Sequence, residues 1–419
     1  MRDEAGIDDA GILKALFQAA LAAALPDGRF APLLPAPPRG RTIVIGAGKA
    51  AARMAQAFEV EWGRPCEGLV VTRYGHACPT RRIEVVEAAH PVPDAAGLAA
   101  ARRILALAEG AGPDDLVVCL ISGGASALLA LPAAGLTLAD KQAMNAALLR
   151  SGAPIGVMNM VRKALSAIKG GRLGAAIAPA RAVPYLISDV PGDDPAAIGS
   201  GPTLPGRVDP EAVLAALADW GITPSATVAR VIRDNALRSA APPEHAVHLI
   251  ATPMMALEAA AARARDFGLA PLILGDAIEG EAREVARVLA GIARACAAHG
   301  HPARPPCVLL SGGETTVTVR GHGRGGRNAE FLLALALALD GAAGISALAC
   351  DTDGIDGSED NAGAWFDSGF LDRARQRGID LKERLAENDA YAVFSALGGL
   401  VTTGPTLTNV NDFRAVLVR

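Results

Sequence analysis

The feature that most constrains the fold of this chain is the segment 42–57, TIVIGAGKAAARMAQA. Its apolar, β-branched start predicts a buried strand at 42–45, and an alanine-rich helix pattern follows the glycines at once. A strand that turns over Gly46 and Gly48 into a helix leaves unpaired backbone N–H groups and the positive end of the helix dipole facing one spot. Because Lys49 stands at that spot, the turn predicts a site for phosphate or carboxylate.

This turn admits two functional interpretations and a structural one. The spacing of Gly46, Gly48 and Ala51 fits the looser dinucleotide fingerprint G-x-G-x-x-G/A. Arg73, at the end of the next predicted strand, could then hold the 2′-phosphate of NADP. In the second interpretation Lys49 faces a phosphoryl group in transfer. The structural alternative is a tight strand–helix turn with a solvated lysine, because one glycine fingerprint is a weak signal.

The overall composition describes a well-buried chain that is too long for one ordinary core. Of its 419 residues 51% are hydrophobic and 20% are charged, which predicts two globular domains. A net charge of −4 and only 4% aromatic residues argue against a nucleic-acid partner. The six cysteines form no C-x-x-C pair, no apolar run is long enough to span a membrane, and the first residues are acidic. We therefore expect a cytoplasmic protein with no membrane partner.

Strand and helix signals alternate along the chain in two series, with Pro242 and Pro243 marking the boundary between them. The fold class expected is α/β. A Rossmann-like, mostly parallel sheet forms the N-terminal domain (1–241), a smaller α/β domain follows (242–419), and the active site lies in the cleft between them. The expected strands are 42–45, 68–72, 83–87, 116–121, 184–188, 246–251, 271–274, 307–311, 315–319 and 345–349. The expected helices are 7–25, 48–61, 96–110, 139–149, 158–168, 210–219, 225–239, 254–267, 279–298, 328–339 and 386–397.

A second glycine turn, Ser122-Gly123-Gly124, follows the predicted strand 116–121, with Ser126 two residues beyond it. Successive N–H groups over glycines form an anion-binding nest, and the serine hydroxyls add donors. A serine-capped strand–helix turn is the structural alternative.

Several cations stand near the double glycine at 170–171. Lys163 and Lys169 close a helical run that is followed by these glycines, a pattern typical of helix C-terminal capping. We therefore assign these two lysines a structural role.

An acidic loop follows the predicted strand 184–188 and carries Asp189, Asp193 and Asp194. Carboxylates at the carboxyl end of a strand suit Mg²⁺, which binds a few carboxylates together with substrate phosphates. Asp189 could equally take the proton of an alcohol. A solvated loop with an Asx turn is the structural alternative.

The second series repeats the Ser-Gly-Gly pattern at 311–313, so Gly312, Gly313 and the following Glu314 form a turn like the first one. Each domain is thus expected to carry one such turn. One of the two turns could hold a substrate carboxylate while the other faces a nucleotide.

A loop rich in glycine and arginine, GHGRGGRN at 321–328, opens a predicted helix. Backbone donors at a helix N-terminus together with Arg324 and Arg327 form a phosphate-binding arrangement. Further on, Asp351 and Asp353 follow a predicted strand and are candidates for contact with a magnesium nucleotide or a ribose. An EF-hand is excluded there, because the glycine required at its sixth position is missing.

Together these motifs resemble those of the glycerate 2-kinases of the MOFRL type. Many ordered motifs over most of the length carry the resemblance. They are VIGAGKAA at 44–51, HPVPDAAG at 90–97, ISGGASALL at 121–129, IKGGRLG at 168–174, SDVPGDDPAAIGSGPT at 188–203, SGGETTVTV at 311–319, GRGGRNAEF at 323–331, DTDGIDGSEDNAGAW at 351–365 and TGPTLTNVNDFR at 403–414.

The resemblance implies that ATP, with Mg²⁺, phosphorylates the 2-hydroxyl of D-glycerate to give 2-phosphoglycerate. The family's essential lysine falls on Lys49 and its essential arginine on Arg327, and Asp189 is the residue we expect to orient or deprotonate the hydroxyl. Ala164 and Ala329 depart from the family pattern, which has histidine and glutamine there. On this assignment D-glycerate contacts Ser122, Gly123, Gly124 and Ser126, the nucleotide contacts Gly46, Gly48, Gly312, Gly313, Glu314, Asp351 and Asp353, and the magnesium ion is held by Asp189 and Asp193.

Two other functions stay open at this point. An NADPH-dependent hydroxypyruvate reductase would use the Gly46 fingerprint and Arg73, although hydride transfer has no need of the arginine-rich loop or the paired aspartates. A non-catalytic protein that binds phosphorylated metabolites would use the anion nests alone. The sequence leaves the oligomeric state open, and a homodimer is compatible with it.

Overall fold

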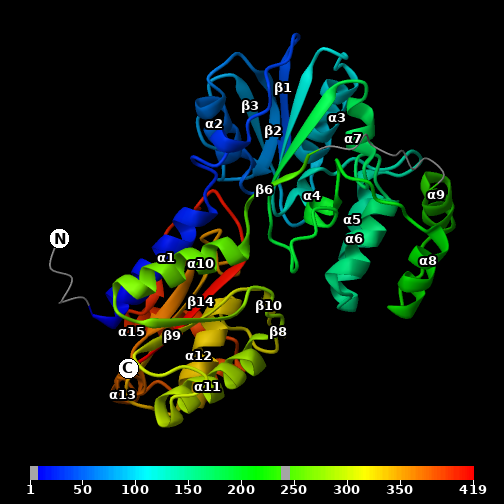
Figure 1. Cartoon of the computed structure of the whole chain (residues 1–419). Helices are drawn as coiled ribbons and strands as arrows, with labels where there is room; N and C mark the ends of the chain where they lie inside the picture. The colour runs from blue at the N-terminus through cyan, green and yellow to red at the C-terminus, as the bar shows by residue number, and fades with distance from the viewer. Residues whose placement is uncertain (1–7, 237–245) are drawn as a thin grey trace. The chain divides into compact units, whose positions relative to one another are not determined.

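The computed structural model of the chain describes residues 8–236 and 246–419 (Figure 1). The chain divides into two compact units. We call Pro26–Ile250 the N-unit, and Met1–Leu25 together with Ala251–Arg419 the C-unit.

This division departs from the expected domains 1–241 and 242–419, because the first helix belongs to the C-unit. That helix, α1 (Asp9–Ala24), packs against α10 (Pro253–Asp266), which follows the crossing between the units. It is amphipathic and buries its apolar side chains, and the ring of Phe17 lies 5.7 Å from that of Phe413 in the C-terminal strand. The boundary expected at 241/242, with its two prolines, lies outside the described residues.

The N-unit alternates strands and helices, as the sequence predicts. Its six-stranded sheet has the order β3-β2-β1-β4-β5-β6, and the pairs from β3 to β5 are parallel. The strands are β1 (Thr42–Ala47), β2 (Glu67–Arg73), β3 (Ile83–Ala88), β4 (Leu116–Ile121), β5 (Arg181–Ile187) and β6 (His248–Ala251). The helices are η1 (Ala31–Leu33), α2 (Ala51–Trp62), α3 (Ala95–Glu109), α4 (Ala125–Leu128), α5 (Leu138–Ser151), α6 (Ile155–Ala164), α7 (Arg172–Ile177), η2 (Ile198–Ser200), α8 (Pro210–Asp219) and α9 (Ala226–Ala236).

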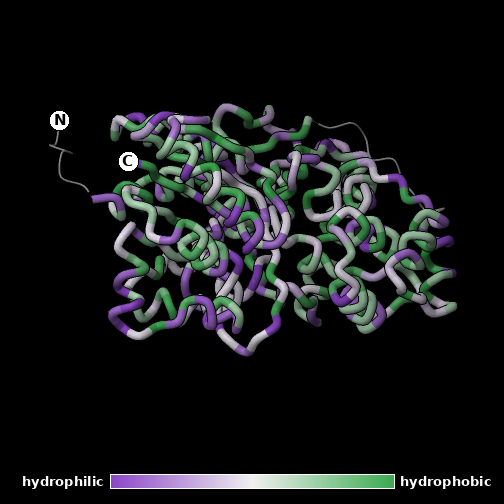
Figure 2. The backbone as a smooth tube through the Cα atoms, turned by 90° about the horizontal axis from the view of Figure 1, so that it is seen from below, coloured by the Kyte–Doolittle hydropathy of each residue, from purple (hydrophilic) through white to green (hydrophobic). Residues whose placement is uncertain are grey.

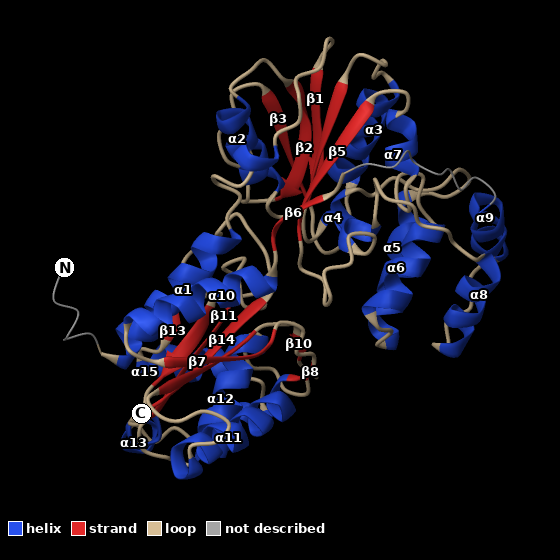
Figure 3. Ribbon diagram, viewed as in Figure 1, coloured by secondary structure: helices blue, strands red, loops and turns tan. Residues whose placement is uncertain are grey.

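Helices cover both faces of this sheet, with α2 on one side and α3 and α7 on the other (Figure 3). Both faces are therefore apolar, and β1 and β4 are buried along their whole length. This is why these strands appear in the sequence as continuous hydrophobic runs, not as an alternation. Beyond the sheet, α5, α6, α8 and α9 pack around an apolar cluster of their own. Both cores lie within the N-unit.

The C-unit is built on a mixed sheet of order β13-β12-β11-β14-β9-β7. Its C-terminal strand β14 is central and antiparallel to both β11 and β9, while β7 and β9 are parallel. Besides α1 and α10, the elements are β7 (Ala270–Gly275), β8 (Gly280–Glu281), α11 (Ala282–His299), β9 (Cys307–Ser311), β10 (Thr315–Thr316), α12 (Arg327–Leu339), β11 (Ile345–Asp351), β12 (Gly363–Phe366), α13 (Phe370–Gln376), α14 (Leu381–Ala386), α15 (Ala390–Leu397), β13 (Leu400–Val401) and β14 (Asp412–Val418).

Helices α11 and α12 cover one face of the C-unit sheet, and α1 and α10 cover the other (Figure 3). The sequence analysis did not predict β12, β13 or β14, and it extended β10 to residue 319, where the structure has a two-residue strand paired with β8. Strands β12 and β13 are too short for an alternation of apolar and polar residues to be recognised in the sequence. The apolar run of β14 is long enough, and Gly404, Pro405 and Asn411 precede it as turn signals, so the sequence carried enough information to predict this strand.

Hydrophobic and hydrophilic segments alternate at short intervals along the backbone (Figure 2). In the parts of the chain that the structure describes, no helix combines the length and the apolar character needed to cross a bilayer. All six cysteines are free thiols, and all but Cys78 are buried.

Candidate active site

The two glycine turns of the N-unit are joined to each other through their backbones. The pairing of β1 with β4 brings the ends of these strands side by side, so the turn after each strand meets the other. The N–H of Lys49 donates to the carbonyl oxygen of Gly123 at 2.8 Å, and the N–H of Ala50 donates to Oγ of Ser122 at 3.0 Å. The N–H of Gly48 donates to a carbonyl of β2. The expectation of unpaired N–H groups at Gly48, Lys49 and Ala50 is therefore wrong, because β2 and the 122–124 turn accept hydrogen bonds from them.

Close packing also explains the glycines of the first turn. A Cβ at Gly46 would lie 2.4 Å from the carbonyl oxygen of Leu120, and one at Gly48 would lie 2.1 Å from Oγ of Ser122. Gly48 moreover has a φ of +136°, which side-chain-bearing residues rarely adopt. The packing of β1 on β4 thus requires the fingerprint without any dinucleotide, and contact between these glycines and a nucleotide stays a prediction.

The turn at 122–124 has the free donors instead. The N–H groups of Gly123 and Gly124 donate to no acceptor within the described part of the chain. Gly124 has a φ of +80°, and a Cβ there would lie 3.2 Å both from Cγ of Lys49 and from the imidazole of His90. The lysine side chain therefore lies directly against this turn. The structure brings the predicted catalytic lysine and the predicted substrate-binding turn together.

Ser126, also predicted to bind substrate, is held by a short chain of polar groups. Its Oγ lies 2.7 Å from Oγ of Ser200, which in turn donates to Oδ1 of Asn159 at 3.0 Å. Ser200 has a φ of +63° and is fully buried. This arrangement fixes the Ser126 hydroxyl beside the glycine turn.

Asp189 and Asp193 lie in the loop that follows β5. Because β5 pairs with β4, this loop leaves the sheet at the same edge as the 122–124 turn. Their carboxylate oxygens are of the kind that Mg²⁺ prefers. Among the described residues, no three His, Cys, Asp or Glu side chains are grouped to hold a metal ion. Magnesium binding by Asp189 and Asp193 stays a prediction, as does proton transfer to Asp189.

Lys169 does not have the capping role assigned to it from the sequence. Helix α6 ends at Ala164, so Lys163 lies in its last turn but Lys169 lies beyond it. The Lys169 side chain is fully buried, and its Nζ donates to the carbonyl oxygen of Leu129 at 2.6 Å. Nothing in the sequence connects this lysine with Lys141 and Arg162, which line one pocket with it. No local pattern predicts that these three cations meet, because they lie on separate segments of the chain.

In the C-unit, Arg327 is the first residue of α12 and is bound by three carboxylates. Its Nε donates to Oδ1 of Asp412, its Nη1 to Oε1 of Glu314 and its Nη2 to Oδ2 of Asp351, each at 2.8 Å. Burial works against the charge of Arg327, but these carboxylates hold its pKa well above the ordinary value. The guanidinium is thus permanently charged and held in one orientation.

Asp412 is a functional candidate that the sequence analysis did not single out, although it lies in the segment 403–414. Its side chain is fully buried, and its second oxygen accepts a hydrogen bond from Arg414 at 2.5 Å. Asn328 Nδ2 donates to its first oxygen at 2.8 Å. One carboxylate of the last strand therefore anchors two arginines.

Asp356 caps the start of α12. Its two oxygens accept hydrogen bonds from the N–H groups of Asn328 and Ala329, at 2.9 and 2.8 Å. Burial raises the pKa of Asp356 to about 6, against the effect of these hydrogen bonds. A Cβ at Gly326 would lie 2.2 Å from Oδ1 of Asp356, which explains why glycine precedes Arg327.

The other predicted nucleotide contacts of the C-unit are mostly packed against protein. The N–H of Gly312 donates to the carbonyl of Gly275 at 2.9 Å, and a Cβ at Gly313 would lie 2.3 Å from the nitrogen of Ile278. Asp351 and Asp353 are buried, and Asp351 accepts a hydrogen bond from the N–H of Asp353 at 3.0 Å. Nucleotide binding by these residues and by Glu314 stays a prediction.

Arg324, expected to bind phosphate together with Arg327, has protein partners of its own. Its guanidinium lies 4.7 Å from the centre of the Tyr391 ring and forms an ion pair with Glu359. Its side chain is largely exposed. Arg324 therefore stabilises the loop at 321–328 against the start of α15, and of the two arginines only Arg327 is partly buried and bound by three carboxylates.

Comparison with known proteins gives matches to both units. The model of DUF4147, a domain of unknown function, matches residues 12–233, and the MOFRL family model matches residues 307–412. The D-glycerate 2-kinase of Thermotoga maritima is 39% identical over 93% of this chain and 94% of its own length. A protein of Agrobacterium vitis, whose name gives hydroxypyruvate reductase as a provisional activity, is 54% identical over 97% of this chain and 94% of its own.

Among solved structures, the crystal structure of a glycerate kinase from Thermotoga maritima is similar over the whole chain. It superimposes with a TM-score of 0.87 at 37% identity, covering 97% of this chain and 99% of that one. The α/β fold of this chain, with its two units, therefore corresponds to the fold of a glycerate kinase. On these matches the chain belongs to the MOFRL-type glycerate 2-kinase family.

Proposed function

We propose that this protein is a kinase that transfers the γ-phosphoryl group of ATP to the 2-hydroxyl of D-glycerate, giving 2-phosphoglycerate and ADP. The observation that carries the proposal is the contact of Lys49 with the 122–124 turn. There an ammonium side chain lies beside two backbone N–H groups that have no acceptor within the described residues. Preorganised donors of this kind stabilise the negative charge on a phosphoryl group in transfer.

The chemistry forms one bond and breaks one. The 2-hydroxyl oxygen of glycerate bonds to the γ-phosphorus, and the bond from that phosphorus to the oxygen bridging to the β-phosphate breaks, leaving ADP. The hydroxyl proton passes to the carboxylate of Asp189, the group we assign to orient the acceptor. Mg²⁺, bound with ATP and held by Asp189 and Asp193, would neutralise charge on the phosphates.

In the C-unit, Arg327 is the residue that we assign to a phosphate of the nucleotide. Its contacts with Asp412 and Asp351 are well buried, whereas Glu314, which binds Nη1, is 49% exposed. The Glu314 contact is therefore the least costly to exchange for a phosphate oxygen, because solvent-exposed ion pairs contribute little. In this proposal Nε and Nη2 stay bound while Nη1 turns to the phosphoryl group. We assign nucleotide contacts to Gly313, Glu314, Asp351 and Asp353. The predicted contacts of Gly46, Gly48 and Gly312 are not part of this proposal, because Gly46 lies within a paired strand and the N–H groups of Gly48 and Gly312 are bonded to protein carbonyls.

A reductase that uses NADPH is the alternative suggested by the name of the Agrobacterium vitis relative. The engaged N–H groups of Gly48, Lys49 and Ala50 argue against it, because a dinucleotide pyrophosphate needs free donors at that turn. The alternative makes a separate prediction, namely loss of NADPH absorbance with hydroxypyruvate.

One experiment tests both activities on the purified full chain. D-glycerate, ATP and Mg²⁺ are expected to yield ADP, measured by a coupled assay, and 2-phosphoglycerate, identified by ³¹P NMR against the 3-phosphate. Oxidation of NADPH by hydroxypyruvate without ADP formation would instead establish the reductase. Binding of D-glycerate without either turnover would indicate a binding protein.

A further inference from the structure

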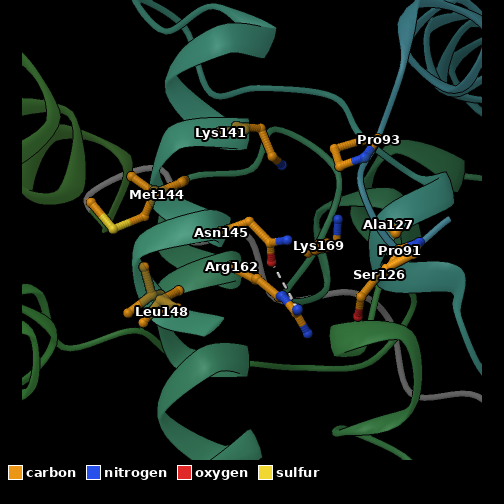
Figure 4. Close-up of a pocket in the computed structure, with 12 residues that line it drawn as sticks. Pro91, Pro93, Ser126, Ala127, Lys141, Met144, Asn145, Leu148, Arg162 and Lys169 are labelled. Carbon is orange, nitrogen blue, oxygen red and sulfur yellow. Dashed lines mark hydrogen bonds between the residues drawn. The ribbon is translucent and has the colours of Figure 1, made fainter. Parts of the chain in front are cut away.

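A small pocket lies beside the 122–124 turn in the N-unit, between α4, α5 and α6 (Figure 4). Ser126 borders it on one side, and the apolar side chains of Met144 and Leu148 border it on another. Its volume is about 30 Å³. A water molecule needs roughly 10–15 Å³ measured in this way, so the pocket has room for a group of two or three atoms.

Three cationic side chains line this pocket. Lys141 comes from α5, Arg162 from α6 and Lys169 from the segment before α7. Figure 4 shows the nitrogen ends of all three directed toward the same space, with Ser126 across from them. Lys141 and Lys169 are buried, and Arg162 is half-buried.

Only neutral groups bind these cations. Lys169 donates to the carbonyl oxygen of Leu129 at 2.6 Å, Lys141 to that of Leu131 at 3.4 Å, and Arg162 to Oδ1 of Asn145 at 2.9 Å. Within residues 8–236 and 246–419, no carboxylate forms an ion pair with any of the three. Buried charge without a counter-charge is costly, so the pocket favours an anion.

The protonation of the lysines reflects this lack of negative charge. Burial, and then the nearby Arg162, lower the pKa of Lys141 to about 7. Burial, with repulsion from Lys141 and Arg162, lowers the pKa of Lys169 well below its usual value. A bound anion would raise both values, so its binding is coupled to proton uptake.

We propose that this pocket binds the carboxylate of the hydroxy-acid substrate, with Arg162 and Lys141 as its cationic contacts and Ser126 at its border. The inference rests on the proposed function for the identity of the acid, D-glycerate. A carboxylate fits the volume of the pocket, whereas a nucleotide is too large for it. A carboxylate also complements the surplus of positive charge in the pocket.

The location of the pocket supports this role. Pro91 and Ser126, which line it, are one and two residues away from His90 and Gly124, and both His90 and Lys49 lie close to Gly124. A three-carbon acid anchored by its carboxylate here extends toward the lysine. The pocket therefore takes over the carboxylate that the sequence analysis assigned to the glycine turn. The N–H groups of Gly123 and Gly124 are left for the phosphoryl group.

The test compares Arg162→Gln and Lys141→Gln with Arg150→Gln, a matched control. Arg150 is exposed in the last turn of α5, so its removal deletes the same charge from the same helix bundle outside the pocket. D-Glycerate is titrated into each full-length variant without nucleotide, by calorimetry. We expect affinity to fall about 10- to 100-fold in the two pocket variants, the range for loss of a charged hydrogen bond, and to be unchanged in Arg150→Gln. Circular dichroism checks that each variant is folded, and Arg162→Lys, which keeps the charge, is expected to restore part of the affinity.

A proton readout separates a direct role of Lys141 from a structural one. The charged groups around Lys141 are Arg162 from α6 and Lys169 from the segment before α7, and α4 contributes only uncharged groups. Since binding raises the pKa of Lys141 from about 7, wild-type protein is expected to take up protons with D-glycerate at pH 8. Binding heats measured in two buffers of different ionisation enthalpy give the number of protons taken up. Affinity is expected to be constant below about pH 7 and to fall above it. Lys141→Gln is expected to reduce the proton uptake, leaving only the part that Lys169 contributes.

The outcomes distinguish this inference from the proposed function. If wild-type protein phosphorylates D-glycerate but Arg162→Gln and Lys141→Gln bind it as wild type does, the pocket assignment is wrong and the kinase stands. A rise in KM for ATP with no change for D-glycerate would also overturn it. If wild-type protein binds D-glycerate without phosphorylating it and the two pocket variants lose that binding, the pocket stands and the proposed kinase falls.

Discussion

Oδ1 of Asp412 accepts a hydrogen bond from Nε of Arg327 at 2.8 Å, and no part of the Asp412 side chain is exposed. The two residues are 85 positions apart. The carboxylate on the C-terminal strand β14 therefore sets the orientation of the arginine that begins α12. Because Arg414 binds the other oxygen of Asp412, loss of this one carboxylate removes a counter-charge from the fully buried guanidinium of Arg414 and from the partly buried one of Arg327.

We predict that Asp412→Asn destabilises the protein strongly. Removing one partner of a buried ion pair costs about 3–5 kcal/mol, because the remaining charge is left buried without compensation. The free energy of unfolding, measured by urea denaturation, is expected to fall by an amount in this range. Asp372→Asn is the control, since its pair with Arg375 is exposed and should change stability by less than about 1 kcal/mol. Equal effects of the two substitutions would contradict the anchoring role of Asp412.

Arg327→Lys is expected to lower kcat about 100-fold or more while keeping the positive charge. Lysine has one ammonium group in place of the planar fork whose three nitrogens each bind a different carboxylate. The loss is the size expected for one preorganised donor to a transition state. Steady-state kinetics with D-glycerate and ATP measure it. Activity close to wild type would mean that charge alone matters at this position.

Lys49→Ala is expected to lower kcat by two orders of magnitude or more, since it removes the cation that lies against the 122–124 turn. The KM for D-glycerate should change much less, because the carboxylate is bound elsewhere. Lys382→Ala, which removes an exposed lysine of α14, serves as the control for loss of one positive charge. An unchanged kcat in the Lys49 variant would exclude this residue from the mechanism.

The pH dependence of stability is expected to report on Asp356. Its pKa is raised to about 6 in the folded protein from the ordinary value of 3.8, so the folded state holds a proton between these values that the unfolded state has lost. The free energy of unfolding therefore falls as pH rises from about 4 to about 6, by about 2–3 kcal/mol. In Asp356→Asn this part of the slope should vanish, whatever the overall stability of the variant. Denaturation curves at several pH values compare the two slopes, and identical slopes would rule out this titration.

Much of the N-unit could be predicted from local patterns. Its buried strands are continuous apolar runs, glycines follow β1 and β4 directly, and parallel strands place the turns that follow them at one edge. The position of Lys49 near the 122–124 turn follows from these facts alone. The C-unit was less predictable, because its last strand β14 belongs to the centre of the sheet and α1 belongs to this unit although it begins the chain.

By itself, the sequence determined the strand–turn–helix units and the residues that stand at their turns. The spacing of apolar residues and the backbone freedom of glycine determine structure over only a few neighbouring positions. Tertiary structure alone decided which donors are free and which charges are paired. Ser122 and Gly123 engage the N–H groups beside Lys49, Asp412 reaches Arg327 from another element, and Lys141 and Arg162 meet from two helices. The physical reason is that hydrogen bonds and buried charges depend on the packing of segments far apart in the chain, which no local pattern encodes.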